Sequence, residues 1–412
     1  MVGAPPLVWP AAGPTRVPYQ VFWDPAIHAL EQERIYRGPT WCFLGLEAEV
    51  AEPKSWKATY VGEIPVVLAR DAHGALNAFV NRCAHRGALV CREPRGQSGH
   101  LTCVYHQWNY DLEGRLRGVP FQRGIGGKGG MPEDFRLQDH RLEPLRVATF
   151  AGLVFGTFSE ETEPIEEYLG PAMAEFVARV FNRPVRVLGY ARQFIRCNWK
   201  IYLENVKDPY HASLLHLFFN TFGLNRLSQV GEVVLDARGR HHVSYSKRAQ
   251  DDQSRLAEVA QANLRTYQKG FRLADPTLLE GPQEYADGIT MQIQSIFPSL
   301  IVQQIANALA VRQILPKGPE AMELVWTYVA YADDDAAMER VRLRQANLVG
   351  PAGYISMEDA EAGELVQRAV RGELEATSFI EMGGRGVASS DHRVTETSIR
   401  GFWQEYRRLM GF

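Results

Sequence analysis

Short apolar runs broken by glycine and aspartate fill residues 41–157, a pattern typical of a small β domain. The run YVGEIPVVLARDAHGALNAFVN predicts two strands joined by an Asp-Gly turn, and LTCVYHQWNYDLEGRLRG repeats that pattern around a Glu-Gly turn. AGLVFGTF has the length of one further strand. Ahead of these runs, an Asp-Pro pair and helical apolar spacing predict a short helix over about 24–36, with Asp24 as its N-cap.

The pattern changes after about position 160. Helical spacing occurs at 164–182, 198–216, 335–348, 359–372 and in the C-terminal TETSIRGFWQEYRRLM, while HHVSYS, TMQIQSIF, LIVQQIANALAVRQIL and LVWTYVAYA each predict a strand. Consecutive strands with helices grouped around them favour an α+β domain on an antiparallel sheet. We therefore expect an N-terminal arm and helix at 1–40, an all-β domain at 41–157, and a helix-grip domain, an antiparallel sheet flanked by helices, at 158–412.

Length and composition agree with two domains of an ordinary globular protein. The chain has 412 residues, of which 45% are hydrophobic and 23% charged, and its net charge is −3. This balance predicts no nucleic-acid partner and no membrane surface. The start lacks the basic and apolar stretches of a signal peptide, and no apolar run reaches the roughly 20 residues of a membrane span. An odd number of cysteines, five, favours thiols or metal ligands in the cytoplasm.

Two short cysteine-histidine pairs stand out in the β domain. Cys83 and His85 are followed, after seventeen residues, by Cys103 and His106. Two such loops can hold a binuclear cluster, with two thiolates on one iron and two imidazoles on the other, which is the Rieske ligand set. A Cys2His2 zinc site is the first alternative, although there the cysteines are normally paired with each other. Core cysteines near unrelated histidines are the second.

A second group of ionisable residues lies in the segment predicted as helix over 198–216. Glu204, Asp208 and His211 recur at helical intervals, so one continuous helix would place them on one face. His216 lies about 140° further round such a helix, so the helix must loosen or end before it if both histidines bind one metal. Two histidines and one carboxylate form the facial triad of non-haem Fe(II) oxygenases. Two ordinary buried histidines are the alternative.

These motifs resemble a known family. CAHRGALV and CVYHQWNY closely match the cluster loops of Rieske oxygenases, and NWKIYLENVKDPYHASLLH matches the mononuclear-iron helix of their large subunits at Asn205, Asp208, His211 and His216. The resemblance covers nearly the whole chain, from TRVPY through LEAEV and HHVSYS to TETSIRGFW. It indicates the large (α) subunit of a Rieske non-haem iron aromatic-ring-hydroxylating oxygenase. The most similar branch contains terephthalate dioxygenase, salicylate 5-hydroxylase and the three-component anthranilate dioxygenases.

The resemblance implies two cofactors, a Rieske [2Fe–2S] cluster and a mononuclear non-haem Fe(II). Respiratory Rieske proteins carry two further cysteines, but this chain has Ala88 and Tyr105 there, which implies the lower-potential oxygenase or ferredoxin type of cluster. A ferredoxin would end after about a hundred residues, and this chain is much longer. The family's iron-binding aspartate comes six residues after a Gly-Pro-Ala-Gly run, which corresponds to Asp359. We prefer Asp359 to Glu358, and expect both in the first turn of a helix, where the macrodipole favours carboxylates. Cys42, Cys91 and Cys197 are interpreted as packing residues.

Assembly and electron supply are also implied by the resemblance. Members of the family receive NADH-derived electrons from a reductase, in some systems through a ferredoxin, and use them with O2. The cluster of one subunit serves the iron of its neighbour, so Asp208 would link His211 to His106 of the partner subunit. Such contacts require a ring, most simply a trimer, with or without a small β subunit (α3β3 or α3).

The branch implies an aromatic carboxylate as substrate. Independently, Arg312 lies in a strand pattern among apolar neighbours, where a guanidinium needs an anion; a buried structural ion pair is the alternative. Ser244 and Arg393 correspond to carboxylate-contacting positions of the terephthalate enzyme. As pocket walls we expect Leu203, Val206, Leu214, Ile293 and Phe297. A Rieske monooxygenase would use the same metals, whereas an electron carrier would lack the triad.

Overall fold

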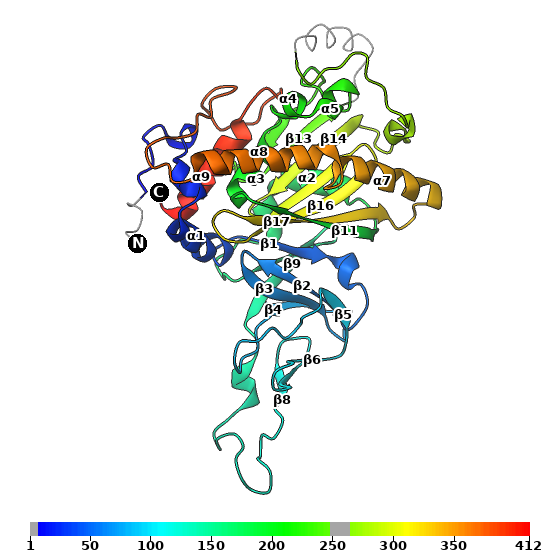
Figure 1. The fold of residues 1–412 in the computed structure, drawn as a ribbon. Coiled ribbons are helices and arrows are strands. Elements are labelled where there is room, and N and C mark those ends of the chain that lie inside the picture. The colour runs from blue at the N-terminus through cyan, green and yellow to red at the C-terminus, as the bar shows by residue number, and fades with distance from the viewer. Residues whose placement is uncertain (1–6, 248–263) are drawn as a thin grey trace. The chain divides into compact units, whose positions relative to one another are not determined.

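The computed structural model describes residues 7–247 and 264–412, and it divides into two compact units. One unit is Tyr36–Ile165, and the other combines the chain up to Ile35 with Glu166–Phe412 (Figure 1). The N-terminal helix therefore belongs to the second unit, although the β domain follows it directly in the sequence. Within the described residues, no helix is long and apolar enough to cross a membrane.

The unit Tyr36–Ile165 is built from antiparallel strands, as the pattern predicts. One sheet has the order β1-β10-β9-β4-β3-β2-β5, and a smaller one has the order β6-β7-β8. The strands are β1 (Cys42–Leu46), β2 (Ser55–Val61), β3 (Ile64–Arg70), β4 (Leu76–Val80), β5 (Arg95–Gln97), β6 (Leu101–Thr102), β7 (Asn109–Tyr110), β8 (Leu116–Gly118), β9 (Pro144–Phe150) and β10 (Leu153–Thr157), with short 3₁₀ helices η4 (Glu47–Val50) and η5 (Leu137–His140). The predicted Asp-Gly turn joins β3 to β4, where the Asp71 carboxylate accepts backbone hydrogen bonds at 2.8 and 2.9 Å.

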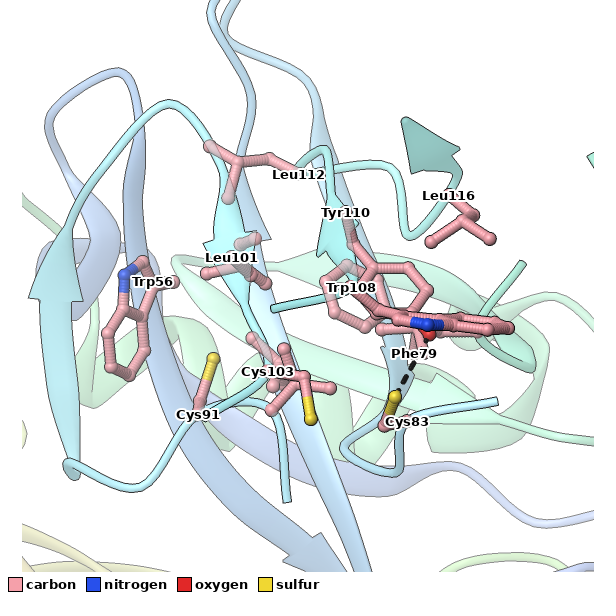
Figure 2. Close-up of a cluster of buried hydrophobic side chains, with 14 residues drawn as sticks. Trp56, Phe79, Cys83, Cys91, Leu101, Cys103, Trp108, Tyr110, Leu112 and Leu116 are labelled. Atoms are coloured by element: carbon pink, nitrogen blue, oxygen red, sulfur yellow. Dashed lines mark hydrogen bonds between the residues drawn. The ribbon is translucent and has the colours of Figure 1, made fainter. Parts of the chain in front are cut away.

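The core of this unit lies beneath the two cysteine-histidine loops. Figure 2 shows the sulfur atoms of Cys83 and Cys103 among large apolar side chains of the surrounding strands. Trp108 and Tyr110, from the end of the second loop and β7, are buried there. The loops are thus anchored at their cysteines by the core of the domain.

The second unit contains a seven-stranded antiparallel sheet with helices grouped around it, which confirms the α+β expectation. Its order is β11-β17-β16-β15-β14-β13-β12. The strands are β11 (Val185–Ile195), β12 (Val233–Leu235), β13 (His242–Lys247), β14 (Ile289–Ile296), β15 (Leu300–Ile305), β16 (Ala308–Pro316) and β17 (Met322–Tyr331). The α-helices are α1 (Pro25–Glu31), α2 (Ile165–Val180), α3 (Trp199–Lys207), α4 (Ala212–Leu215), α5 (Leu217–Thr221), α7 (Ala336–Val349), α8 (Tyr354–Val370) and α9 (Thr397–Met410). Short helical turns are η1 (Gly13–Thr15), η2 (Tyr19–Phe22), η3 (Gln32–Tyr36) and η6 (Pro276–Leu279).

Figure 1 shows α7 and α8 running across the strands of this sheet, beside α3. Apolar side chains from α4, α5, α7 and α8 form one cluster with side chains of β14, β15 and β16. The N-terminal helix is fixed by a buried ion pair, in which Lys200 Nζ of α3 lies 2.6 Å from Glu31 of α1 and both side chains are fully buried. Asp24 caps α1 as predicted, accepting from the backbone of Ala26.

Two sequence expectations about this unit are wrong. LIVQQIANALAVRQIL is not one strand but the hairpin β15–β16, which turns at Ala306 with a φ of 48°. The turn contains no glycine. A residue of another element holds it in place, because the backbone N–H of Asn307 donates to the side chain of Gln345 of α7 at 2.6 Å. The helix expected to begin at 359 begins at Tyr354, so Glu358 and Asp359 lie in its second turn.

Candidate active site

The two cysteine-histidine loops have the same backbone plan. In each, the N–H of the residue four positions after the cysteine bonds back to the cysteine carbonyl at 2.9 Å. That residue is Gly87 in the first loop and Gln107 in the second, and both have positive φ. Positive φ costs glycine little, whereas in Gln107 it marks a position that the loop imposes.

The cysteines and the histidines of these loops differ in burial. Cys83 and Cys103 are buried, whereas His85 and His106 are exposed with ring centroids 4.6 Å apart. The ring of His85 stacks on Trp108 at 4.7 Å, which fixes its orientation. Two buried sulfurs and two exposed imidazoles fit a binuclear cluster with an inner thiolate-bound iron and an outer imidazole-bound iron.

The protein also supplies a hydrogen bond to the sulfur side of this site. The Tyr110 hydroxyl lies 3.3 Å from Cys83 Sγ, as the dashed line in Figure 2 shows. Burial raises the pKa of the Cys83 thiol, so a bound cation is needed to hold it as thiolate. Cys91 lies in the same core cluster as Cys83 and Cys103, whereas Cys42 and Cys197 are buried outside it. Burial raises the pKa of each of these three thiols to about 12, which agrees with packing roles.

His211, His216 and Asp359 come together in the second unit. One ligand atom of each lies within 4.8 Å of the other two. Asp359 Oδ1 is 3.4 Å from Nε2 of His211 and 3.2 Å from Nε2 of His216. Two imidazole nitrogens and one carboxylate directed at one point fit a single divalent metal ion of the facial-triad type, as the sequence predicts.

A break in the helix makes this convergence possible. The expected helix over 198–216 ends at Lys207; Asp208 has extended geometry, and α4 begins again after His211. Pro209 follows the break and cannot donate the hydrogen bond that would continue α3. Glu204 and Asp208 consequently do not share a helix face, which corrects the sequence expectation. Glu204 is buried and accepts from Trp403 Nε1 at 2.6 Å instead.

The electrostatics of the group favour a cationic occupant. Burial alone would lower the pKa of His211, but hydrogen bonds and charges from Asp208 and Asp359 outweigh it and raise the pKa to about 10. The same competition raises the pKa of His216. Although burial opposes ionisation of Asp359, the two histidines lower its pKa far below the usual range. A metal ion at this point replaces the two protons and meets an already ionised carboxylate.

Neighbouring side chains orient the three candidate ligands. Asn205 Nδ2 donates to Asp359 Oδ1 at 3.1 Å and lies 3.4 Å from His211 Nε2. Glu358 Oε2 lies 2.7 Å from Nδ1 of His216, so its side chain serves the histidine and not the point of convergence. Asp208 Oδ2 lies 3.5 Å from Nδ1 of His211. Each histidine therefore has a carboxylate behind it, an arrangement that fixes the tautomer of metal-bound imidazoles.

A cavity of about 580 Å³ opens beside the three ligands. The cavity is lined by the three candidate ligands, by residues on both sides of the break between α3 and α4, and by side chains of strands β13 to β17. Of the predicted wall residues, Val206 and Ile293 line the cavity, whereas Leu203, Leu214 and Phe297 are not among its lining residues.

Of the three residues predicted to bind the substrate, two line the cavity and one does not. Arg312 and Ser244 line the cavity, and Arg312 is 5% exposed. Arg393 is buried but is not among the lining residues, and its guanidinium donates to the side chain of Asn225 and to the carbonyl of Arg226. Sequence reasoning missed Asn225 altogether. No motif identifies it, because its position depends on a hydrogen bond between residues far apart in the chain.

Comparisons with known proteins identify a family for each of the two sequence regions. The family model described as ring hydroxylating alpha subunit (catalytic domain) matches residues 172–411, and that of the Rieske [2Fe-2S] domain matches 40–137. The Comamonas sp protein named terephthalate 1,2-dioxygenase, terminal oxygenase component subunit alpha 2, is 51% identical over 98% of this chain and 97% of its own. The anthranilate 1,2-dioxygenase large subunit of Burkholderia cepacia is 50% identical over 97% and 94%.

The fold agrees as well. A crystal structure of naphthalene 1,2-dioxygenase from Rhodococcus sp. bound to indole matches with a TM-score of 0.80 at 23% identity, covering 96% of this chain and 94% of that one. Paired cysteine-histidine loops, a two-histidine, one-carboxylate group, and these matches lead to one conclusion. The chain belongs to the ring-hydroxylating α-subunit family of Rieske non-haem iron oxygenases, whose members carry a [2Fe–2S] cluster and a mononuclear iron.

Proposed function

We propose that this chain is the large subunit of a terminal oxygenase that dihydroxylates an aromatic carboxylate. The cluster ligands would be Cys83, His85, Cys103 and His106, and the iron ligands would be His211, His216 and Asp359. The observation that carries the substrate class is a buried arginine in the cavity next to the proposed iron ligands. The names of the two 50–51% identical relatives point to the same class.

The surroundings of Arg312 support an anionic ligand. One guanidinium nitrogen donates to the Tyr202 hydroxyl at 2.9 Å, and the group lies 4.9 Å from the ring of Trp326. Its Nε is buried and has no hydrogen-bond partner, and Arg312 forms no ion pair with a residue that the structure describes. A buried cation without an anion is costly, and a planar guanidinium fits a carboxylate in two-point contact.

The residues around the cavity have separable roles in this proposal. Iron(II) bound at the triad would supply the position at which O2 is activated. Asn205 and Glu358 hold Asp359 and His216 in place, and Arg312 fixes the acid group of the substrate. Apolar walls such as Val206 and Ile293 exclude water from the ring and direct it toward the triad.

Electron supply requires partners. Terminal oxygenases of this family work with separate electron-transfer components, and for this chain we propose an NADH-dependent reductase, possibly with a ferredoxin, in the cytoplasm where NADH is available. A trimer of large subunits, alone or with a small β subunit, would let one chain's cluster serve another chain's iron. Asp208, which is partly exposed beside His211, would connect it to His106 of the partner subunit.

The test is product identification. Purified chain with its reductase, NADH and O2 would be given benzene-1,4-dicarboxylate, 2-aminobenzoate and 2-hydroxybenzoate separately. The proposal expects a cis-dihydrodiol, or the catechol that 2-aminobenzoate would give, from one of these acids. A simple phenol from the preferred acid would instead show a monooxygenase, and no product from any aromatic acid would contradict the proposed substrate class.

A further inference from the structure

The start of α8 brings Asp359 to the triad, but it has no side-chain cap of its own. The N-cap residue is Gly353, which cannot accept from the first N–H groups of the helix, and the first turn contains no acidic residue. Helix ends without such support fray, because their first N–H groups have no partner inside the helix. A metal ligand this close to a helix end therefore needs another element to hold the backbone that carries it.

Strand β11 supplies this support through two hydrogen bonds between one pair of residues. Ser356 Oγ donates to Oε1 of Gln193 at 2.7 Å, and Gln193 Nε2 donates to the backbone carbonyl of Ser356 at 3.2 Å. Since a carbonyl only accepts, the Gln193 amide satisfies both contacts in a single orientation. Ser356 lies one helical turn before Asp359, is 1% exposed, and lines the cavity. The pair thus fixes α8 immediately ahead of the proposed iron ligand.

Two further contacts hold the same helix on the other side of Asp359. Glu364 Oε1 accepts from the backbone N–H of Arg196 at 3.1 Å, and Gln367 Oε1 accepts from that of Asn198 at 2.7 Å. Both donors follow β11 directly in the chain, so the strand and the residues after it attach α8 at three points. The first of the three, described above, is the one on the N-terminal side of Asp359.

We propose that Gln193 is a positioning residue of the iron site, which acts through Ser356 to set the direction in which Asp359 presents its carboxylate to the metal. Asn205 donates to Asp359 Oδ1 at 3.1 Å, but that contact orients the side chain and does not hold the backbone of α8. Without Gln193 the helix stays attached by its two later contacts while its start loosens. The inference rests on the proposed function, because it assumes that iron binds at the triad.

The test compares Q193L with E364A, a matched control that also removes a contact to α8 from the region of β11, but beyond Asp359. Each protein is loaded anaerobically with iron(II) while its cluster is oxidised and gives no EPR signal. Iron affinity is measured against graded chelator, the geometry of the iron site by the EPR signal of its nitric oxide complex, and stability by thermal unfolding. Q193L should weaken iron binding about five- to tenfold and change the rhombicity of the nitric oxide signal. E364A should lower thermal stability and leave both iron measurements at their wild-type values.

S356A is the second variant, and it removes one hydroxyl while leaving the helix backbone intact. It should change the nitric oxide signal in the same direction as Q193L, even if Q193L folds poorly. Unchanged iron affinity and an unchanged signal in S356A and in folded Q193L would overturn the positioning role, and so would equal changes in Q193L and E364A. A wild-type protein that binds no iron, or a D359A protein that binds it normally, would instead contradict the proposed iron ligands, which is a different failure.

Discussion

Glu358 Oε2 lies 2.7 Å from Nδ1 of His216, on the side of the imidazole that faces away from Asp359. Two neighbouring residues of α8 thus have different roles. Asp359 is directed at the proposed metal, and Glu358 at His216, a proposed ligand of that metal. Glu358→Ala should therefore weaken iron binding about 10- to 100-fold without abolishing it, as outer contacts of metal-bound histidines typically do. Iron content after dialysis against graded chelator measures this effect.

Asp359→Ala is the matched control for that variant. It should lose the iron entirely while the visible spectrum of the cluster remains. If Glu358→Ala loses all iron and Asp359→Ala retains it, the assignment of the carboxylate ligand is shifted by one residue.

The cluster assignment predicts a distinct spectroscopic change. Purified protein should be brown and, after reduction, should give the g-anisotropic EPR signal of a histidine-ligated [2Fe–2S] centre. Cys83→Ser and His106→Cys should both abolish this signal, because each alters the ligand set of one iron. Cys91→Ser should retain it, since Cys91 packs in the core beneath the loops and is not one of the four proposed ligands. Stoichiometric zinc with no labile sulfide in the wild-type protein would exclude a cluster.

Arg312→Leu should lower affinity for the aromatic acid by about ten- to a hundredfold, corresponding to roughly 1.5–3 kcal/mol for a charge-assisted contact. Tyr202→Phe is the control, because it removes the hydrogen-bond partner of Arg312 and keeps the charge. That variant should bind the acid nearly normally. Equal losses in both variants would indicate that the pair is structural and that the guanidinium does not bind the acid.

Asp208 tests electron transfer between subunits. Its carboxylate accepts from the backbone of Tyr210 at 2.8 Å and lies 3.5 Å from Nδ1 of His211, and it is not one of the three proposed iron ligands. Asp208→Asn should leave both metal sites filled and reduction of the cluster by the reductase normal. Oxidation of the reduced cluster by O2 in the presence of substrate should slow severely. A wild-type rate in fully metallated Asp208→Asn would remove Asp208 from the electron path.

The sequence predicted those parts of the molecule that depend on local spacing. Both cysteine-histidine loops, the Asp24 cap and the turn at Asp71 are determined by residues within a few positions, and all are confirmed. The hairpin at Ala306 could not be predicted, because contacts from α7 hold its turn.

The helix break before His211 was predicted only in part. Two histidines five residues apart required the helix to end between them, and it does, because α4 ends at Leu215 and His216 has extended geometry. The additional break at Asp208 was not predicted, and it separates Glu204 from the site. The role of Arg393 depends on Asn225, which lies 168 residues away in the chain and carries no motif. Such pairings arise from tertiary packing and leave no periodic signal.

In the proposed reaction, electrons stored in the cluster are used at the triad to oxidise an aromatic acid. The most direct test is a single turnover, in which protein with reduced cluster and bound iron, free of reductase, is mixed with O2 and the preferred acid. In the wild-type protein we expect the cluster to reoxidise, followed by its visible absorbance, while ring-hydroxylated product forms. In Asp359→Ala the cluster should stay reduced and no product should form. Reoxidation at the wild-type rate with product formation in iron-free Asp359→Ala would show that the triad is not the site of oxidation.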